Sequence, residues 1–143
     1  MPEFVMPKGR NYRRFDNLDN FTQGYVRAAF FTIDEELNDK TFDDLDGTTL
    51  ARFVKDSEHF QGANASILAL AYASSGYSEE RAGIDFWFTR NGHGAGYWDR
   101  EELTGLACGK NNETNAGKVL ADRARGFGNV DLYAGDDGRL YLA

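Results

Sequence analysis

The chain has 143 residues, of which 41% are hydrophobic and 27% are charged. This composition is typical of a folded domain and excludes a chain that is disordered throughout. The formal net charge of −7 argues against an ordinary nucleic-acid-binding module, which neutralises phosphates with a basic face. A single cysteine, Cys108, excludes a disulfide framework and a cysteine-based zinc site, and no apolar run approaches the roughly twenty residues that span a bilayer. We therefore expect a soluble cytoplasmic protein that makes no contact with a membrane.

Both prolines and four basic residues lie within the first sixteen residues, which show little hydrophobic periodicity. We interpret residues 1–16 as a flexible basic arm and residues 17–143 as a single domain. Apolar residues recur at helical spacing from about residue 18 to 33, and Asn17 or Asp19 can supply the N-cap of this helix. The acidic segment 34–46 follows, and it is either a solvated loop or a patch that binds a basic partner or imitates the DNA backbone.

Asp46 is expected to cap a long central helix that runs to about residue 74, and Gly62 is a point at which this helix kinks or divides. Ser78 then precedes two acidic residues, which is typical of a helix start, and the Asn-Gly pair at 91–92 is typical of a helix end. These signals favour a helix over residues 79–90. A strand is the alternative, because apolar and polar residues alternate in part of this range.

After this helix, residues 96–98 are expected to form a short strand and residues 100–113 an irregular segment. A helix is predicted over residues 114–125, and a β-hairpin over residues 130–142 with the turn Gly135-Asp136-Asp137-Gly138. The predicted fold is therefore α+β. It has three to four helices, one of them long and central, packed with a small antiparallel sheet that ends in the C-terminal hairpin.

The segment from Asp85 to Arg100 is the candidate functional region, because it gathers both tryptophans, one of the two histidines and three alternating glycines. Its glycine loop, residues 92–96, is either a helix cap with a tight turn or a backbone nest for an anion. The place of the loop after a helix C-terminus favours the cap, since the helix dipole disfavours an anion there. The aromatic residues are either core residues or a stacking platform for bases or for a partner's side chain. The candidate binding residues are Trp87, Arg90, Asn91, His93, Tyr97 and Trp98.

His93 with Asp85 or Asp99 is the candidate catalytic group, and such a histidine–carboxylate pair, with or without a metal ion, would serve a small hydrolase or nuclease. No serine or cysteine nucleophile motif accompanies His93, and a lone cysteine such as Cys108 is typical of packing. The turn at residues 135–138 resembles a calcium loop only in part, because the glutamate at its twelfth position is missing. We therefore assign no catalytic residue, no metal site and no cofactor from the sequence.

The run Asp85-Phe86-Trp87-Phe88-Thr89-Arg90-Asn91-Gly92-His93-Gly94-Ala95-Gly96-Tyr97-Trp98-Asp99 resembles the hallmark of a family of small uncharacterised proteins encoded by tailed bacteriophages and prophages. Further segments similar to that family are Thr49-Leu50-Ala51, Val130-Asp131-Leu132-Tyr133, Gly135-Asp136-Asp137-Gly138 and Leu140-Tyr141. The chain departs from the family at Ile84, where relatives are expected to carry a histidine, and over residues 101–112. The resemblance implies a phage origin and action in the cytoplasm of a bacterial host, and it implies no particular activity.

Our leading hypothesis is a non-enzymatic phage accessory protein that binds a host or phage macromolecule, with a protein as the favoured partner, in host takeover or counter-defence. The expected contact surface combines residues 91–98 with the acidic segment 34–46. The alternatives are the hydrolase or nuclease described above, and a single-stranded nucleic-acid-binding protein. The latter would need the basic arm and the aromatic residues on one face.

Overall fold

Residues 12–74 and 76–143 are described by the structure, a computed structural model of the chain. Within this part of the chain there are seven α-helices and four short strands, with one-turn 3-10 helices between some of them. The helices are α1 (Tyr12–Asp16), α2 (Asn20–Phe31), α3 (Gly47–Ala63), α4 (Ala65–Ser74), α5 (Glu79–Arg90), α6 (Glu101–Thr104) and α7 (Ala116–Arg125). The strands are β1 (Ala107–Cys108), β2 (Thr114–Asn115), β3 (Leu132–Ala134) and β4 (Leu140–Leu142). They form two separate antiparallel pairs, β1 with β2 and β3 with β4.

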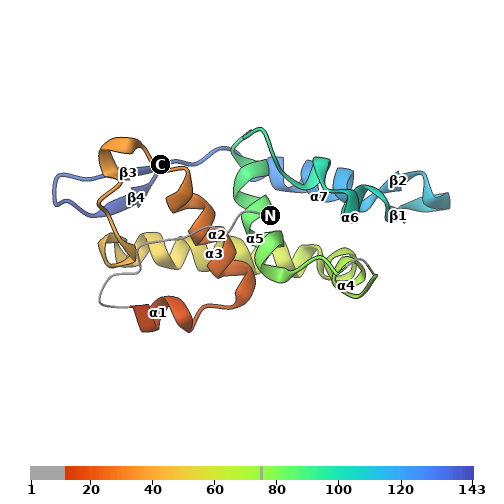
Figure 1. Ribbon diagram of the computed structural model, residues 1–143, viewed down its shortest axis with the longest axis horizontal. Helices are drawn as coiled ribbons and strands as arrows, with labels where there is room; N and C mark the ends of the chain where they lie inside the picture. The colour runs from red at the N-terminus through yellow and green to blue at the C-terminus, as the bar shows by residue number, and fades with distance from the viewer. Residues whose placement is uncertain (1–11, 75) are drawn as a thin grey trace.

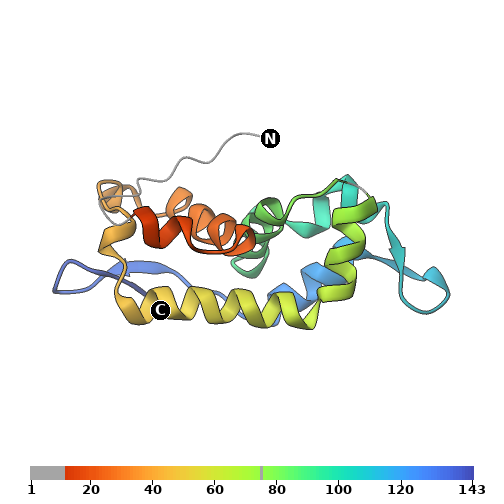
Figure 2. The same cartoon turned by 90° about the horizontal axis from the view of Figure 1, so that it is seen from below.

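Helix α3 runs along one side of the elongated molecule, and α1, α2 and α5 lie on the other side (Figure 1, Figure 2). Helix α4 turns away from the end of α3. The two hairpins lie at opposite ends of the long axis, β3–β4 near the start of α3 and β1–β2 beyond its end (Figure 1). The fold is therefore a helical body with a small hairpin at each end.

Helices α2 and α5 make the most extensive helix–helix contact, and two glycines allow their backbones to touch. A Cβ atom on Gly83 would lie 1.8 Å from the carbonyl oxygen of Phe21, and one on Gly24 would lie 2.1 Å from the carbonyl oxygen of Glu80. Neither position has room for a side chain, because the neighbouring atoms belong to the backbone of the opposite helix. Gly24 and Gly83 therefore set the distance at which α2 crosses α5.

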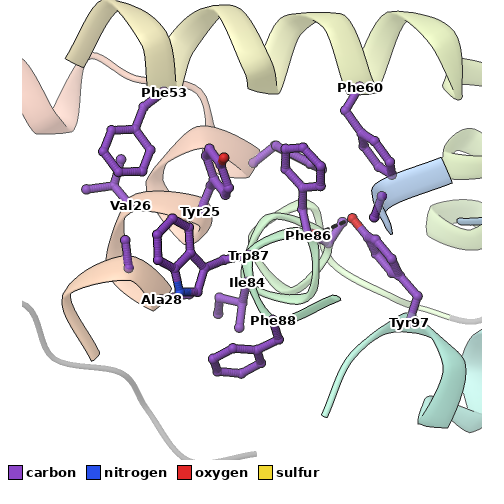
Figure 3. Packing of buried hydrophobic residues seen from close by; sticks show 14 of the residues in the cluster. Tyr25, Val26, Ala28, Phe53, Phe60, Ile84, Phe86, Trp87, Phe88 and Tyr97 are labelled. Carbon is purple, nitrogen blue, oxygen red and sulfur yellow. Dashed lines mark hydrogen bonds between the residues drawn. The ribbon is translucent and has the colours of Figure 1, made fainter. Parts of the chain in front are cut away.

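The core between α2, α3 and α5 is built mainly from aromatic side chains (Figure 3). The ring of Phe86 lies at its centre, with centroid distances of 4.4 Å to Phe60 and 4.7 Å to Tyr25. Phe21 also contacts Phe86, and Trp87 lies edge-on to Tyr25. Each such pair contributes about 0.5–1.5 kcal/mol beyond the area that it buries. The high aromatic content of the sequence is thus used for packing.

Several predicted elements are confirmed. Helix α2 begins after Asp19, whose carboxylate accepts a hydrogen bond from the backbone N–H of Thr22 at 2.7 Å. Residues 79–90 are a helix and not a strand, with Ser78 as the N-cap and Asn91 as the C-cap. The C-terminal hairpin is also present, with Leu132 paired to Leu142. In these places the local start, stop and turn residues were sufficient signals.

The long helix capped by Asp46 is divided in two, but at Asn64 and not at Gly62, and the number of helices exceeds the three to four expected. The helix capped by Asp46 ends at Ala63, and α4 begins after Asn64, whereas Gly62 lies inside α3. Arg123 of α7 donates hydrogen bonds to the Ala63 carbonyl oxygen at 3.4 Å and to Asn64 Oδ1 at 2.7 Å. The helix divides where α7 supplies partners for its terminal groups, which the local sequence does not reveal.

The short strand expected over residues 96–98 is wrong, because Tyr97–Asp99 is a 3-10 turn. The Asp99 N–H donates to the Gly96 carbonyl at 3.2 Å, and the Gly96 N–H donates to Asp99 Oδ1 at 3.0 Å. The segment 100–113 is less irregular than expected, since it contains α6 and β1. A polar side chain that closes its own turn therefore overrides the aromatic strand signal.

Two charged segments of the sequence have short helical turns. In the expected arm, residues 12–16 form α1, where Phe15 is buried edge-on to Phe42, and residues 1–11 lie outside the described residues. The acidic segment 34–46 contains two 3-10 turns, Glu35–Leu37 and Phe42–Asp44. It contacts the C-terminal hairpin through a bridge between Leu45 and Leu140 and through a hydrogen bond from Lys40 Nζ to the Gly138 carbonyl at 2.9 Å.

Candidate functional site

Asp85, a candidate catalytic residue, is fully buried and bound to Arg100 and Tyr77. Arg100 donates from Nη2 to Asp85 Oδ1 at 2.8 Å and from Nε to both carboxylate oxygens at 3.0 and 3.1 Å. The Tyr77 hydroxyl donates to Asp85 Oδ2. Burial raises the pKa of Asp85 above its ordinary value, and the bonds from Arg100 and Tyr77 act in the opposite direction. The pair joins α5 to the segment after the glycine loop, so its evident effect is to position that segment.

Arg90, a candidate binding residue, is also buried, and its guanidinium joins four parts of the fold. Its Nη1 donates to the Tyr25 hydroxyl at 2.8 Å and to Asp56 Oδ2 at 2.9 Å. Its Nε donates to the Gly128 carbonyl at 2.9 Å, and its Nη2 to the Phe127 carbonyl at 3.0 Å. A planar fork of donors suits this arrangement, which a lysine could not reproduce. Arg90 thus connects α5 to α2, α3 and the turn after α7.

The three aromatic candidates are divided between core and surface. Trp87 is buried in the aromatic core (Figure 3). Its indole N–H donates to Thr32 Oγ1 at 2.7 Å. Tyr97 is fully buried, and its hydroxyl donates to the Ala82 carbonyl at 2.6 Å. Trp98 is 44% exposed. A stacking platform of all three is therefore not present, and Trp98 is the member of the group that a partner can contact.

A pocket of about 340 Å³ lies beside the glycine loop, and we call it the His93 pocket. Its polar and aromatic lining consists of Thr32, Trp87, Asn91, His93, Asn129 and Asp131, and Val130 and Ala143 complete it. Asn91 fixes one wall, because its Nδ2 donates to the Trp87 carbonyl at 3.0 Å and its Oδ1 accepts from the Val130 N–H at 2.7 Å. The pocket thus lies between the C-terminal ends of α2 and α5 and the segment that leads into β3.

His93 is exposed at the rim of this pocket. Gly92 turns the chain with a φ of 69°, a value that favours glycine, and the His93 N–H then donates to the Phe88 carbonyl at 2.9 Å. The imidazole ring lies edge-on to Phe88 at 5.7 Å, and Phe88 lies edge-on to Phe31 at 6.5 Å. Phe31 is 60% exposed. Phe31, Phe88 and His93 therefore form a chain of aromatic contacts, of which His93 lines the pocket.

The pairing of His93 with Asp85 or Asp99 stays a hypothesis. The oxygens of Asp85 are engaged by Arg100 and Tyr77, and Asp99 Oδ1 accepts from the Gly96 N–H. Over residues 12–74 and 76–143, no group of three or more histidine, cysteine, aspartate or glutamate side chains is placed to hold a metal ion. The carboxylate that lines the same pocket as His93 is Asp131, which the sequence did not single out.

Sequence reasoning identified three of the lining residues, Trp87, Asn91 and His93, and missed Thr32, Asn129 and Asp131. A signal existed for Thr32, since it ends a predicted helix. No local signal existed for residues 129–131, because the hydrogen bond from Val130 to Asn91 spans 39 positions of the chain. A second hollow, of about 620 Å³, is lined by Asp56, His59, Arg123 and Phe127 among others, and it too had no signal in the sequence.

No protein-family model, curated protein or solved structure matches this chain. None of the helices in the described residues is long and apolar enough to cross a lipid bilayer.

Proposed function

We propose that this protein is a phage-encoded accessory protein that binds a host or phage protein in the cytoplasm of the bacterial host, and that it does so through the His93 pocket and the loop around it. The phage origin rests on the resemblance of the motif from Asp85 to Asp99 to the phage family. The binding function rests on how the residues of that motif are used.

One observation carries the proposal: the charged residues Asp85, Arg90 and Arg100 are used inside the fold, whereas His93 of the same segment is exposed and lines a pocket. Asp85 forms an ion pair with Arg100, and Arg90 forms an ion pair with Asp56 of α3. His93 and Trp98 are exposed and lie on the loop that these pairs hold in place. An exposed loop residue such as His93 at a concave site, with an exposed aromatic residue on the same loop, is typical of a recognition surface.

The experiment is affinity capture from a lysate of the bacterial host, with and without phage infection, using the folded chain as bait. We expect one protein to be captured in stoichiometric amount by the wild-type chain and by His59→Ala, and to be lost with His93→Ala. His59 is the matched control, because it is the other histidine, is also exposed, and lines a different hollow. All three proteins are compared by urea denaturation, so that a loss of binding is assigned to contact and not to unfolding.

The proposal is contradicted if no partner is captured, or if His93→Ala and wild type capture it equally. It is also contradicted by a His93-dependent shift of single-stranded DNA that weakens with added salt, which would support the nucleic-acid alternative. Hydrolysis of a phosphodiester or ester by the purified wild-type chain, abolished by His93→Ala, would favour the enzyme.

A further inference from the structure

The His93 pocket lies where two helices end. Thr32 is the C-cap of α2 and Asn91 is the C-cap of α5, and both residues line the pocket. Each helix has twelve residues. The aligned peptide dipoles of such a helix place a partial charge of about −0.5 at its C-terminus, and the effect is confined to the last turn. Two such ends converge on one pocket, so its backbone environment is negative.

The side chains that line the pocket add to this negative field. Asp131 contributes an exposed carboxylate, and Asn129 contributes an amide. Among the described residues that line the pocket, none is a lysine or an arginine. The field therefore favours a cation and disfavours a phosphate or a carboxylate.

The walls suit a cation that has an apolar stem. Trp87 and Val130 form part of the lining, and the His93 ring stands at its rim. Lysine and arginine side chains pack their methylene stems against apolar surface and place the charged group in a polar environment. A volume of about 340 Å³ is at the small end of ligand pockets, which span about 300–1,000 Å³, and is suited to one side chain and not to a large cofactor.

We infer that the His93 pocket receives a lysine or arginine side chain from a basic segment of the protein partner, with the charged group near Asp131 and the two helix ends. This inference rests on the proposed function for the existence of a protein partner. It adds the chemical class of the segment that is recognised, and it predicts that the pocket itself selects against anions.

The test uses the folded full chain, labelled with ¹⁵N and titrated at low ionic strength with small probes. The cationic probes are N-acetyl-arginine amide and N-acetyl-lysine amide, and the neutral probe of similar shape is N-acetyl-glutamine amide; inorganic phosphate is the anionic probe. We expect saturable shifts of the backbone amide signals of His93, Asn129 and Asp131 with the cationic probes. Asp131→Asn should weaken this binding about threefold, as expected for a solvated ion pair.

Asp136→Asn is the matched control, because it removes the same charge from an exposed position in the β3–β4 turn, outside the pocket. It should leave the binding of the cationic probes within a factor of about two, since screening at the surface makes distant charges count little. The inference is overturned if phosphate or the glutamine probe shifts the same signals as strongly as the cationic probes. It is equally overturned if the cationic probes leave these signals unchanged.

The probe titration and the affinity capture fail independently. If His93-dependent capture of a partner is found but the cationic probes do not bind, the proposed function stands and the assignment of a basic segment is wrong. If the cationic probes bind in the pocket but no partner is captured, the pocket assignment stands and the proposed function is contradicted.

Discussion

The substitution Gly83→Ala tests the contact that organises the helical body. In an isolated helix this change is stabilising by up to about 1 kcal/mol, because alanine is the better helix former. Here the new Cβ would lie 1.8 Å from the Phe21 carbonyl oxygen. A comfortable C···O separation is about 3.3 Å, so the overlap amounts to about 1.5 Å. Only a movement of α2 away from α5 can relieve it, since the obstructing atoms are backbone.

The cost of this movement is at the upper end of overpacking, about 3 kcal/mol, because the aromatic core on both helices has to follow. Subtracting the gain in helix propensity leaves a net loss of about 2 kcal/mol in the free energy of unfolding. With a urea slope of about 2 kcal/mol per molar, the unfolding midpoint should fall by about 1 M. The fluorescence of Trp87 is a suitable signal, because this side chain is buried among the rings of α2 and α3.

Gly62→Ala is the matched control. Gly62 is also inside a helix, but nothing lies within 4 Å of a Cβ placed there. It should therefore show the propensity gain alone, about 0.5–1 kcal/mol of stabilisation. If Gly83→Ala is as stable as the wild type, or gains stability as Gly62→Ala should, α2 and α5 do not cross at backbone contact and the reasoning is refuted.

Three further predictions concern polar contacts. Asp85→Asn should lower the free energy of unfolding by about 3 kcal/mol, because Arg100 loses its ionic partner; urea denaturation with no measurable loss would contradict this. Arg90→Lys should also lower the free energy of unfolding by about 3 kcal/mol, since an ammonium cannot bond to Tyr25, Asp56 and two carbonyls together. A urea midpoint equal to that of the wild type would contradict this. In the hairpin, the Tyr141 hydroxyl and the Arg139 N–H hold the pKa of Asp137 below its ordinary value, and Asp137 raises the pKa of Tyr141 to about 12. Stability from Asp137 should therefore be present at neutral pH and be lost as the pH falls through its lowered pKa, and Tyr141→Phe should bring the pKa of Asp137 back up in a carboxyl NMR titration.

The helices and turns that the sequence predicted correctly are those whose signals are local. Ser78 caps its helix by accepting a hydrogen bond from a backbone N–H three residues later, and Asn91 with Gly92 ends that helix within one turn. The sequence placed a kink or division of the next helix at Gly62, and the helix divides at Asn64, whose side chain also accepts from Arg123, 59 positions away. The 3-10 turn at Tyr97–Asp99 was predictable in principle, since Asp99 closes it within three residues. The neighbouring aromatic residues Tyr97 and Trp98, however, are also typical of a strand.

For the candidate site, the sequence predicted the loop and not the pocket. His93 and Asn91 were candidates because they lie in a short segment that gathers aromatic, ionisable and glycine residues, and such a local concentration is visible in the sequence. Asp131 and Thr32 belong to the pocket only because α2 and the segment before β3 are brought to the same helix end. The Thr32–Trp87 hydrogen bond and the Asn91–Val130 hydrogen bond create this proximity. Contacts of this kind form only when the chain is folded, and the hydrophobic periodicity of the sequence does not predict them.

The division of the motif between interior and rim determines what a mutation in it can report. A substitution at Arg90 or Asp85 weakens the fold, so a loss of binding in such a variant carries no information about contact with a partner. A substitution at His93 or Trp98 removes exposed atoms, which contribute little to stability. In variants of Asp85 and Arg90, partner affinity and the free energy of unfolding should therefore both fall. In variants of His93 and Trp98, partner affinity should fall while the free energy of unfolding stays close to that of the wild type. Because both groups lie on the same sixteen-residue segment, measuring the two quantities for each variant separates the recognition surface from its support.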